Sequence, residues 1–120
     1  MEPTASMALR AARKAGDLIV RASDDMDRVG YQAKAAADFV TEVDIAAEKE
    51  ILYQLGKAYP EHRFLCEESG LSGNEDSDYT WVIDPLDGTS NFLRGIPHYA
   101  ISIACLHRGK IEHAVVYDPV

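Results

Sequence analysis

A short apolar run followed by two carboxylates and a glycine occupies residues 79–90: Tyr79-Thr80-Trp81-Val82-Ile83-Asp84-Pro85-Leu86-Asp87-Gly88-Thr89-Ser90. Residues 79–83 predict a buried strand, because aromatic and β-branched side chains dominate them. The strand is expected to stop at Asp84-Pro85, since proline has no N–H to continue a ladder. A tight turn and a brief helix over residues 89–94 should follow. Two carboxylates are therefore predicted to lie at the end of a buried strand.

Two helices are predicted before this stretch. Apolar and small residues recur at helical spacing over residues 4–22 and again from about Asp44 to Tyr59. Asp44 suits the N-cap or the first turn of the second helix, and Pro60 should end it. Residues 24–38 are polar and then small, which favours a loop or a mobile hairpin between the helices.

The remaining segments predict strands and turns. Residues 63–66 form a short strand, and the Gly, Ser, Asn and Asp content of residues 70–78 indicates a surface loop. Residues 99–107 and 111–117 are two further strands. Arg108-Gly109-Lys110 is the hairpin loop between them, with glycine placed for a positive φ. The predicted class is α+β, with two long helices packed on a mainly antiparallel sheet.

Composition narrows the function classes. The chain has 120 residues, with 20 acidic and 12 basic side chains and a formal net charge of −8. That length suits one domain, and that charge argues against a general nucleic-acid binder. No apolar run is long enough to span a bilayer, and no secretory signal is recognisable, so a cytoplasmic protein is expected. Cys66 and Cys105 are expected to be reduced thiols, with a disulfide as the alternative.

The residues after the buried strand have the chemistry of a metal and phosphate site. Pro85 stiffens the turn, so Asp84, the Leu86 carbonyl and Asp87 can be directed at one point. Carboxylate and carbonyl oxygens are the ligands of hard cations such as Mg²⁺. Gly88 allows a ligand to approach the backbone, and a helix that begins at Thr89 offers N–H groups to an anion.

Three other interpretations fit part of this pattern. An ordinary surface turn also uses Asp, Pro and Gly, but a long apolar strand directed at the turn argues against it. A haloacid-dehalogenase-type phosphatase has one residue between its two carboxylates, whereas this chain has two. A calcium loop needs Glu at its twelfth position, and counting from Asp84 that position is Gly95.

Three linked motifs resemble the inositol monophosphatase family, whose members are Mg²⁺-dependent, lithium-sensitive phosphatases. The run from Trp81 to Phe92 is similar to the family's first signature. Asp38-Phe39-Val40-Thr41-Glu42-Val43-Asp44 resembles its Asp-x-Val-Thr-x-x-Asp, and Cys66-Glu67-Glu68-Ser69 resembles its Gly-Glu-Glu-Ser. The bacterial SuhB-type branch is the most similar. The resemblance implies the N-terminal part of the family's layered αβαβα fold.

The resemblance also implies roles for individual residues. Glu67 and Asp84, with the Leu86 carbonyl, would hold a first Mg²⁺, and Asp84 and Asp87 would share a second. The backbone N–H groups of Gly88 and Thr89, beside Asp87, would bind the substrate phosphate. Thr89, oriented by Asp44, would position the attacking water together with Glu67. Lys34 matches a basic residue on the family's mobile active-site loop.

The expected function follows from that resemblance. Residues 1–120 would be an N-terminal metal- and phosphate-binding domain that lacks the family's C-terminal signature, Trp-Asp-x-Ala-Ala-Gly. The whole protein would hydrolyse inositol 1-phosphate or a related polyol phosphate, would form a homodimer and would have no membrane partner. The alternatives are a SuhB-like role in ribosomal RNA transcription antitermination, a nucleotide 3′-phosphatase, a fructose bisphosphatase, or a chain that is inactive by itself.

Overall fold

The computed structural model describes residues 3–29, 33–94 and 96–120. Its elements confirm the α+β class, because two long helices come first and the strands follow, interrupted only by the short helix α3. They are α1 (Pro3–Val29), α2 (Ala33–Ala58), β1 (Arg63–Cys66), β2 (Gly70–Gly73), β3 (Tyr79–Asp87), α3 (Thr89–Leu93), β4 (Ala100–His107) and β5 (Lys110–Tyr117).

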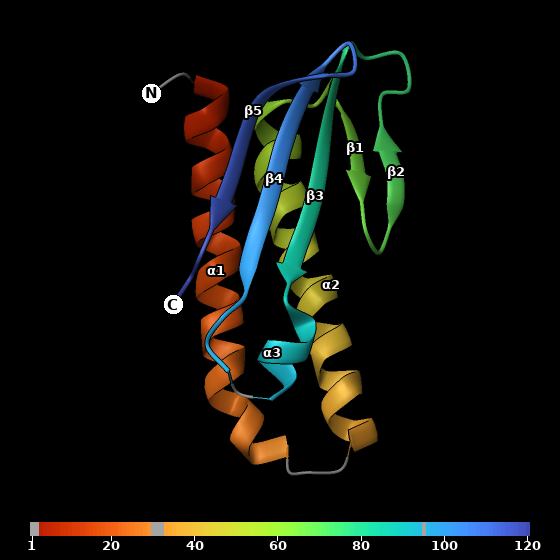
Figure 1. Cartoon of the computed structure of the whole chain (residues 1–120). Coiled ribbons are helices and arrows are strands. Elements are labelled where there is room, and N and C mark those ends of the chain that lie inside the picture. The colour runs from red at the N-terminus through yellow and green to blue at the C-terminus, as the bar shows by residue number, and fades with distance from the viewer. Residues whose placement is uncertain (1–2, 30–32, 95) are drawn as a thin grey trace.

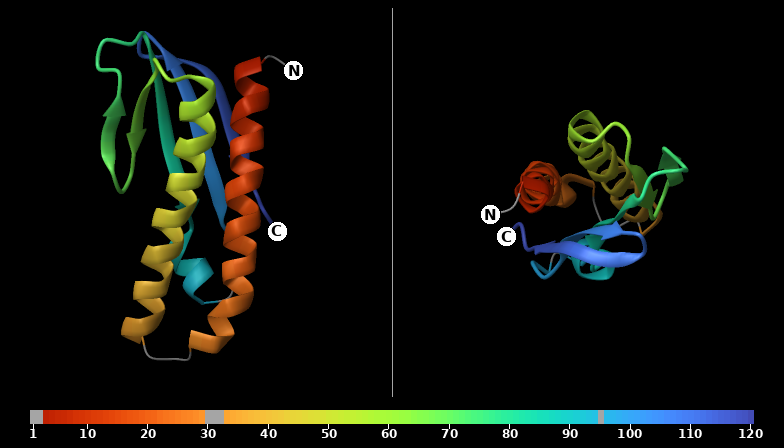
Figure 2. Two further views of the ribbon diagram at one scale, coloured as in Figure 1. Left: turned by 180° about the vertical axis from the view of Figure 1, so that it is seen from behind. Right: turned by 90° about the horizontal axis from the view of Figure 1, so that it is seen from above.

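One sheet organises the molecule, with its strands in the order β2-β1-β3-β4-β5. The pair β1–β3 is parallel and the other three pairs are antiparallel, as expected for a mainly antiparallel sheet. Helices α1 and α2 lie side by side on one face of this sheet, and α3 lies at the end of β3 (Figures 1 and 2). The acidic residues at the end of β3 are thus close to the long helices.

The core lies between the two helices and the sheet. Small side chains on α1, among them Ala11, Ala12 and Ala15, are completely buried, as is Ile51 on α2. Alanines at these positions let the helix backbones approach one another closely, because little side-chain volume separates them. From the sheet, the buried side chains of β3, among them Trp81, fill the space beneath the helices. The expectation of reduced thiols is confirmed, since neither Cys66 nor Cys105 forms a disulfide, and both are buried in this core.

Both long helices extend further than predicted. Helix α1 continues to Val29 and α2 begins at Ala33, so the loop expected over residues 24–38 is wrong apart from residues 30–32, which lie outside the described part. Residues 24–29 contain no Gly or Pro to stop a helix, although their apolar periodicity fades. Asp44 therefore lies in the interior of α2, and its assignment to an N-cap or first turn is corrected. Neither helix is apolar enough over sufficient length to cross a membrane, judged on the described residues.

Two strand predictions also need correction. Residues 70–73 form β2 and pair with β1, although they were expected to belong to a surface loop. Strand β3 continues through Pro85 to Asp87, because the β3–β4 register shifts between Asp84 and Asp87. This bulge leaves Pro85 outside the regular ladder, which is where a strand tolerates a residue without an N–H. The bulge also redirects the chain immediately before Gly88.

The β4–β5 hairpin turns at Arg108 and Gly109, whereas Lys110, which was predicted to belong to the loop, begins β5. Gly109 has a φ of 81°, and Arg108 before it has a φ of 52°. Positive φ at both central residues gives a turn whose twist matches that of the flanking strands. Strand β5 consequently forms an edge of the sheet next to α1 (Figure 1).

Candidate functional site

An acidic cluster forms where α2 passes the turn after β1 and the end of β3. Asp44 on α2 is only 6% exposed, and its Oδ1 atom has no hydrogen-bond partner among the described residues. Burial, followed by the negative charges of Glu68 and Glu67, raises the pKa of Asp44 to about 7. An ionised Asp44 is therefore costly in this position unless a cation approaches it.

Glu67 and Asp84 are the two predicted metal ligands that the fold brings together. Glu67 follows β1 directly, and Asp84 lies in β3, the parallel neighbour of β1. A hydrogen bond between these two carboxyl groups, with the repulsion between their charges, raises the pKa of Glu67. A cation between the two carboxylates would remove the repulsion between them.

Glu48 is a buried member of the cluster whose role was not predicted. It lies one helical turn after Asp44 and is 3% exposed. Its Oε1 accepts the N–H of Glu68 at 3.0 Å, and its Oε2 accepts the N–H of Ser69 at 3.1 Å. The i,i+4 spacing of Asp44 and Glu48 was a signal in the sequence that both face the same way. Only the fold shows what they face.

The signature loop after Asp84 has the conformation that a close ligand approach requires. The Leu86 N–H donates to Asp84 Oδ1 at 3.3 Å, which orients that carboxylate within the bulge. Gly88 is the N-cap of α3 with a φ of 98°, and a Cβ there would lie 3.1 Å from the His98 carbonyl oxygen. Only glycine fits this left-handed, crowded position without strain. The prediction that a helix begins at Thr89 is confirmed.

A cavity of about 370 Å³ adjoins this loop. Asp87 and Gly88 line it, together with residues from α3, the following loop, β4 and the end of the chain. Its size is in the range of small-molecule sites. The lining residues are Asp87, Gly88, Asn91, His98, Tyr99, Ala100 and Asp118.

Some predicted site residues are not brought together. Asp87 is exposed, and the side chains that act electrostatically on Asp44 are those of Glu68, Glu67 and Asp84. The backbone of Lys34 belongs to α2, but its side chain lies outside the described residues. Within residues 3–29, 33–94 and 96–120, no three His, Cys, Asp or Glu side chains form a ready-made metal site.

The donor set nevertheless fits a hard cation in its chemistry. Carboxylates at Asp44, Glu67 and Asp84 concentrate negative charge, and no Lys or Arg of the described residues forms an ion pair with them. The raised pKa values of Asp44 and Glu67 and the unpartnered Asp44 oxygen are consequences of that concentration and of burial. A divalent ion among oxygen donors would remove much of this electrostatic cost, because it neutralises the repulsion between the carboxylates.

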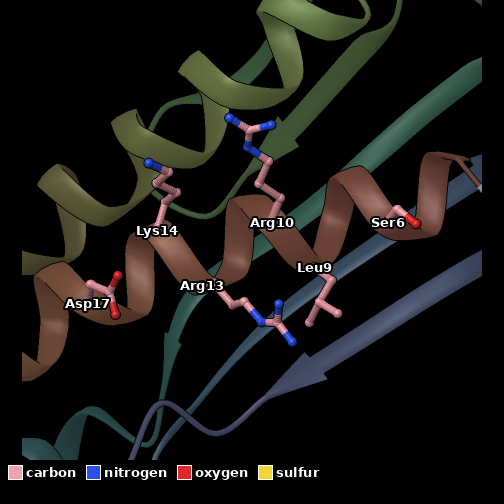
Figure 3. Close-up of a pocket in the computed structure, with 6 residues that line it drawn as sticks. All are labelled: Ser6, Leu9, Arg10, Arg13, Lys14 and Asp17. Carbon is pink, nitrogen blue, oxygen red and sulfur yellow. The ribbon is translucent and has the colours of Figure 1, made fainter. Parts of the chain in front are cut away.

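A separate surface depression of about 420 Å³ lies on α1. Figure 3 shows its three basic side chains, Arg10, Arg13 and Lys14, around the helix, with Asp17 at one end. All four side chains are exposed. The depression is lined by α1 alone and is mainly basic, on a chain that is acidic as a whole.

The amino-acid sequence is similar to one protein family and to several curated proteins. A model of the inositol monophosphatase family matches residues 1–120. The chain is 54% identical over 122 residues to the Nus factor SuhB of Pseudomonas aeruginosa and 50% identical over 120 residues to the Nus factor SuhB of Escherichia coli strain K12. Each match covers 100% of this chain and 45% of the relative. The chain thus spans a little under half the length of these proteins.

Solved structures agree with this placement. The extragenic suppressor protein suhB from Bartonella henselae has a TM-score of 0.85 and 41% identity, over 98% of this chain and 44% of that one. An inositol monophosphatase from Anabaena (Nostoc) sp. PCC 7120 has a TM-score of 0.77 and 33% identity, over 98% of this chain and 40% of that one. With the three motifs and the shared fold, these matches establish that the chain belongs to the inositol monophosphatase family and is of the SuhB type.

Proposed function

We propose that residues 1–120 are the N-terminal metal- and phosphate-binding domain of a Mg²⁺-dependent phosphatase that hydrolyses inositol 1-phosphate or a related polyol phosphate. The observation that carries the proposal is the uncompensated acidic cluster of Asp44, Glu67 and Asp84 beside the Gly88 loop. A phosphate monoester approaches such a cluster only when cations neutralise it. Membership of a phosphatase family supports the same conclusion.

The proposed ligand roles follow the family motifs. Glu67, Asp84 and the Leu86 carbonyl would hold one Mg²⁺, and Asp84 with Asp87 would share a second. Bound Mg²⁺ would lower the pKa of a water molecule and neutralise charge on the phosphoryl group. The N–H groups of Gly88 and Thr89 would donate hydrogen bonds to phosphate oxygens at the start of α3.

The remaining residues would orient the attacking water and the substrate. Glu67 would accept a hydrogen bond from that water, and Thr89 would hold it from the other side. Asp44 would orient the Thr89 hydroxyl, which the packing of α2 against α3 supports. Lys34, in the N-terminal part of α2, would neutralise negative charge at the active site. No covalent nucleophile is required, because water attacks the phosphorus directly.

Phosphate release from inositol 1-phosphate tests the proposal. We expect release that requires Mg²⁺, is inhibited by Li⁺ and falls at least about 100-fold in Asp84→Asn, because that change removes a shared metal ligand. Asp76→Asn, in the exposed loop before β3, is the matched control and should keep full activity. A substrate panel with nucleotide 3′-phosphates and fructose bisphosphate separates the related phosphatases.

The assay needs two forms of the protein. One is this chain alone, and the other is a chimera that continues after Val120 with the C-terminal part of the Pseudomonas aeruginosa relative, of which the chain spans 45%. If the chimera is active and the 120-residue chain is not, the N-terminal domain needs a C-terminal part for activity. Absence of Mg²⁺-dependent release from the folded chimera, with every substrate of the panel, would contradict the proposal.

A second candidate is a role in a transcription complex that does not need turnover. The names of the curated relatives, Nus factor SuhB, favour this role over the phosphatase. The basic depression of Arg10, Arg13 and Lys14 gives the acidic chain a surface suited to an anionic partner. Under this proposal, the acidic cluster is not used in the complex.

Co-purification with RNA polymerase and antitermination factors tests this candidate. We expect Asp84→Asn to bind as the unchanged protein does, whereas Arg10→Ala, Arg13→Ala and Lys14→Ala combined should weaken binding. Loss of binding in a folded Asp84→Asn variant would contradict a role independent of the metal site.

A further inference from the structure

Glu48 makes a contact that no other member of the acidic cluster makes. Its carboxylate leaves α2 and accepts two consecutive backbone N–H groups, of Glu68 at 3.0 Å and of Ser69 at 3.1 Å. The side chain is 3% exposed, so water does not compete for either hydrogen bond. Hydrogen bonds to a buried carboxylate are charge-assisted and stronger than those between neutral groups.

The contact fixes the turn that carries Glu67. Residues 67–69 connect β1 to β2, and the N–H of Glu68 belongs to the peptide unit that begins at Glu67. Holding that N–H sets the orientation of the peptide plane after Glu67. The Glu67 side chain is itself exposed, so packing does not hold it in place. Its approach to Asp84 therefore depends on the backbone that Glu48 anchors.

The carboxylate of Glu48 carries an electrostatic cost at this position. Glu48 adds a buried acidic side chain one helical turn from Asp44, whose pKa is already raised by burial and by the charges of Glu68 and Glu67. Removing a charge from water is costly without a compensating cation. The gain specific to a carboxylate is two acceptor oxygens, which match two neighbouring N–H donors at once.

We infer that Glu48 is a positioning residue, which holds the turn of residues 67–69 so that Glu67 and Asp84 meet at one cation. The inference rests on the proposed metal-dependent function and adds a residue to its site. Glu48 does not touch the cation. It acts through the backbone of Glu68 and Ser69, and its contribution is the position of Glu67.

Binding of Mn²⁺ to the 120-residue chain tests the inference, because Mn²⁺ prefers the same oxygen donors and is visible by electron paramagnetic resonance. We expect Glu48→Gln to weaken Mn²⁺ binding about tenfold, since an amide offers one acceptor and turns an NH₂ group toward the second N–H. Glu42→Gln removes the same charge from an exposed position on α2 and should change the affinity less than twofold.

A second variant separates position from charge. Glu48→Asp keeps the carboxylate but shortens its reach, so we expect it to weaken Mn²⁺ binding as Glu48→Gln does. If Glu48→Gln does not fold, Glu48→Asp still tests the inference. Circular dichroism and thermal melting, recorded without metal, establish that each compared variant is folded at the temperature of the measurement.

The outcomes distinguish the inference from the function on which it rests. Weaker Mn²⁺ binding in folded Glu48→Gln and Glu48→Asp supports it. Unchanged Mn²⁺ affinity with a lowered melting temperature would mean a purely structural role and would overturn it. Wild-type affinity in Glu48→Asp would assign the effect to charge and would also overturn it. If the unchanged chain and the chimera both fail to bind Mn²⁺, the metal-dependent function falls, and the inference with it.

Discussion

At the scale of single residues, the contacts that His62 makes in the fold depend on the protonation state of its ring. Its Nδ1 accepts the indole N–H of Trp81 at 3.0 Å, and its ring stacks on Tyr59 at 4.8 Å and on Tyr79 at 4.7 Å between centroids. Burial lowers the pKa of His62, against a smaller opposing effect of Glu61. The neutral ring is therefore the form that fits, because a protonated Nδ1 would face another donor.

This arrangement predicts a pH dependence of stability. Because the pKa of His62 is lower in the folded chain than in the unfolded one, its contribution is complete above the unfolded value of 6.5 and is lost as the pH falls below it. We expect the melting temperature to fall by about 3 °C more, between pH 7 and pH 5, than it does in His62→Asn. The indole N–H resonance of the single tryptophan should shift over the same range. A resonance that does not respond to pH would contradict the prediction.

At the scale of elements, the packing of α1 on β5 depends on a missing side chain. Gly16 is buried in α1, and a Cβ at this position would lie 2.8 Å from Cε2 of Tyr117 and 3.0 Å from Cβ of Pro119. Both neighbours belong to the end of β5 and the residues after it. The glycine therefore lets a helix lie against an edge strand, at the expense of helix propensity.

Two glycine substitutions in helices should have opposite effects. Gly16→Ala is expected to destabilise the chain by about 1–2 kcal/mol, because the added methyl group displaces Tyr117. Gly56→Ala on α2 has no heavy atom within 4 Å of the new Cβ and should stabilise it by about 0.5–1 kcal/mol. Urea unfolding at equilibrium measures both. Stabilisation by Gly16→Ala would show that β5 moves aside without cost.

At the scale of the whole molecule, the helices cover one face of the sheet and leave the other uncovered (Figure 2). Tyr117 faces α1, so Val116 faces the opposite side and is 74% exposed. Ile111, Leu65 and Val82 are also exposed large apolar residues of the sheet. Strand β5 lies at an edge of the sheet and pairs with β4 alone among the described strands.

The uncovered apolar face predicts self-association of the 120-residue chain. Sedimentation velocity over a range of concentrations should show species larger than a monomer, because an exposed edge strand and apolar face can pair with a second copy. Val116→Glu should shift the chain toward the monomer. Tyr53→Glu, at a 60% exposed site on α2, is the control and should not. A concentration-independent monomer would contradict the prediction.

The sequence by itself determined the α+β class, the strand at residues 63–66, the helix start at Thr89 and the motifs that identify the family. These depend on local patterns, namely hydrophobic periodicity, turn residues and spacing within a short segment. The same reasoning failed where the local signal was weak. Polar residues 24–29 continue α1, and residues 70–73 form a strand only because β1 lies beside them.

Only the tertiary structure decided how the acidic residues meet. Asp44 and Glu48 are separated by about twenty residues from the turn they face, so no local pattern carries the two hydrogen bonds from Glu68 and Ser69 to Glu48. The bulge that lets β3 pass through Pro85 likewise depends on pairing with β4. Local sequence selects the elements, whereas burial and pairing between distant segments determine which carboxylates share one environment.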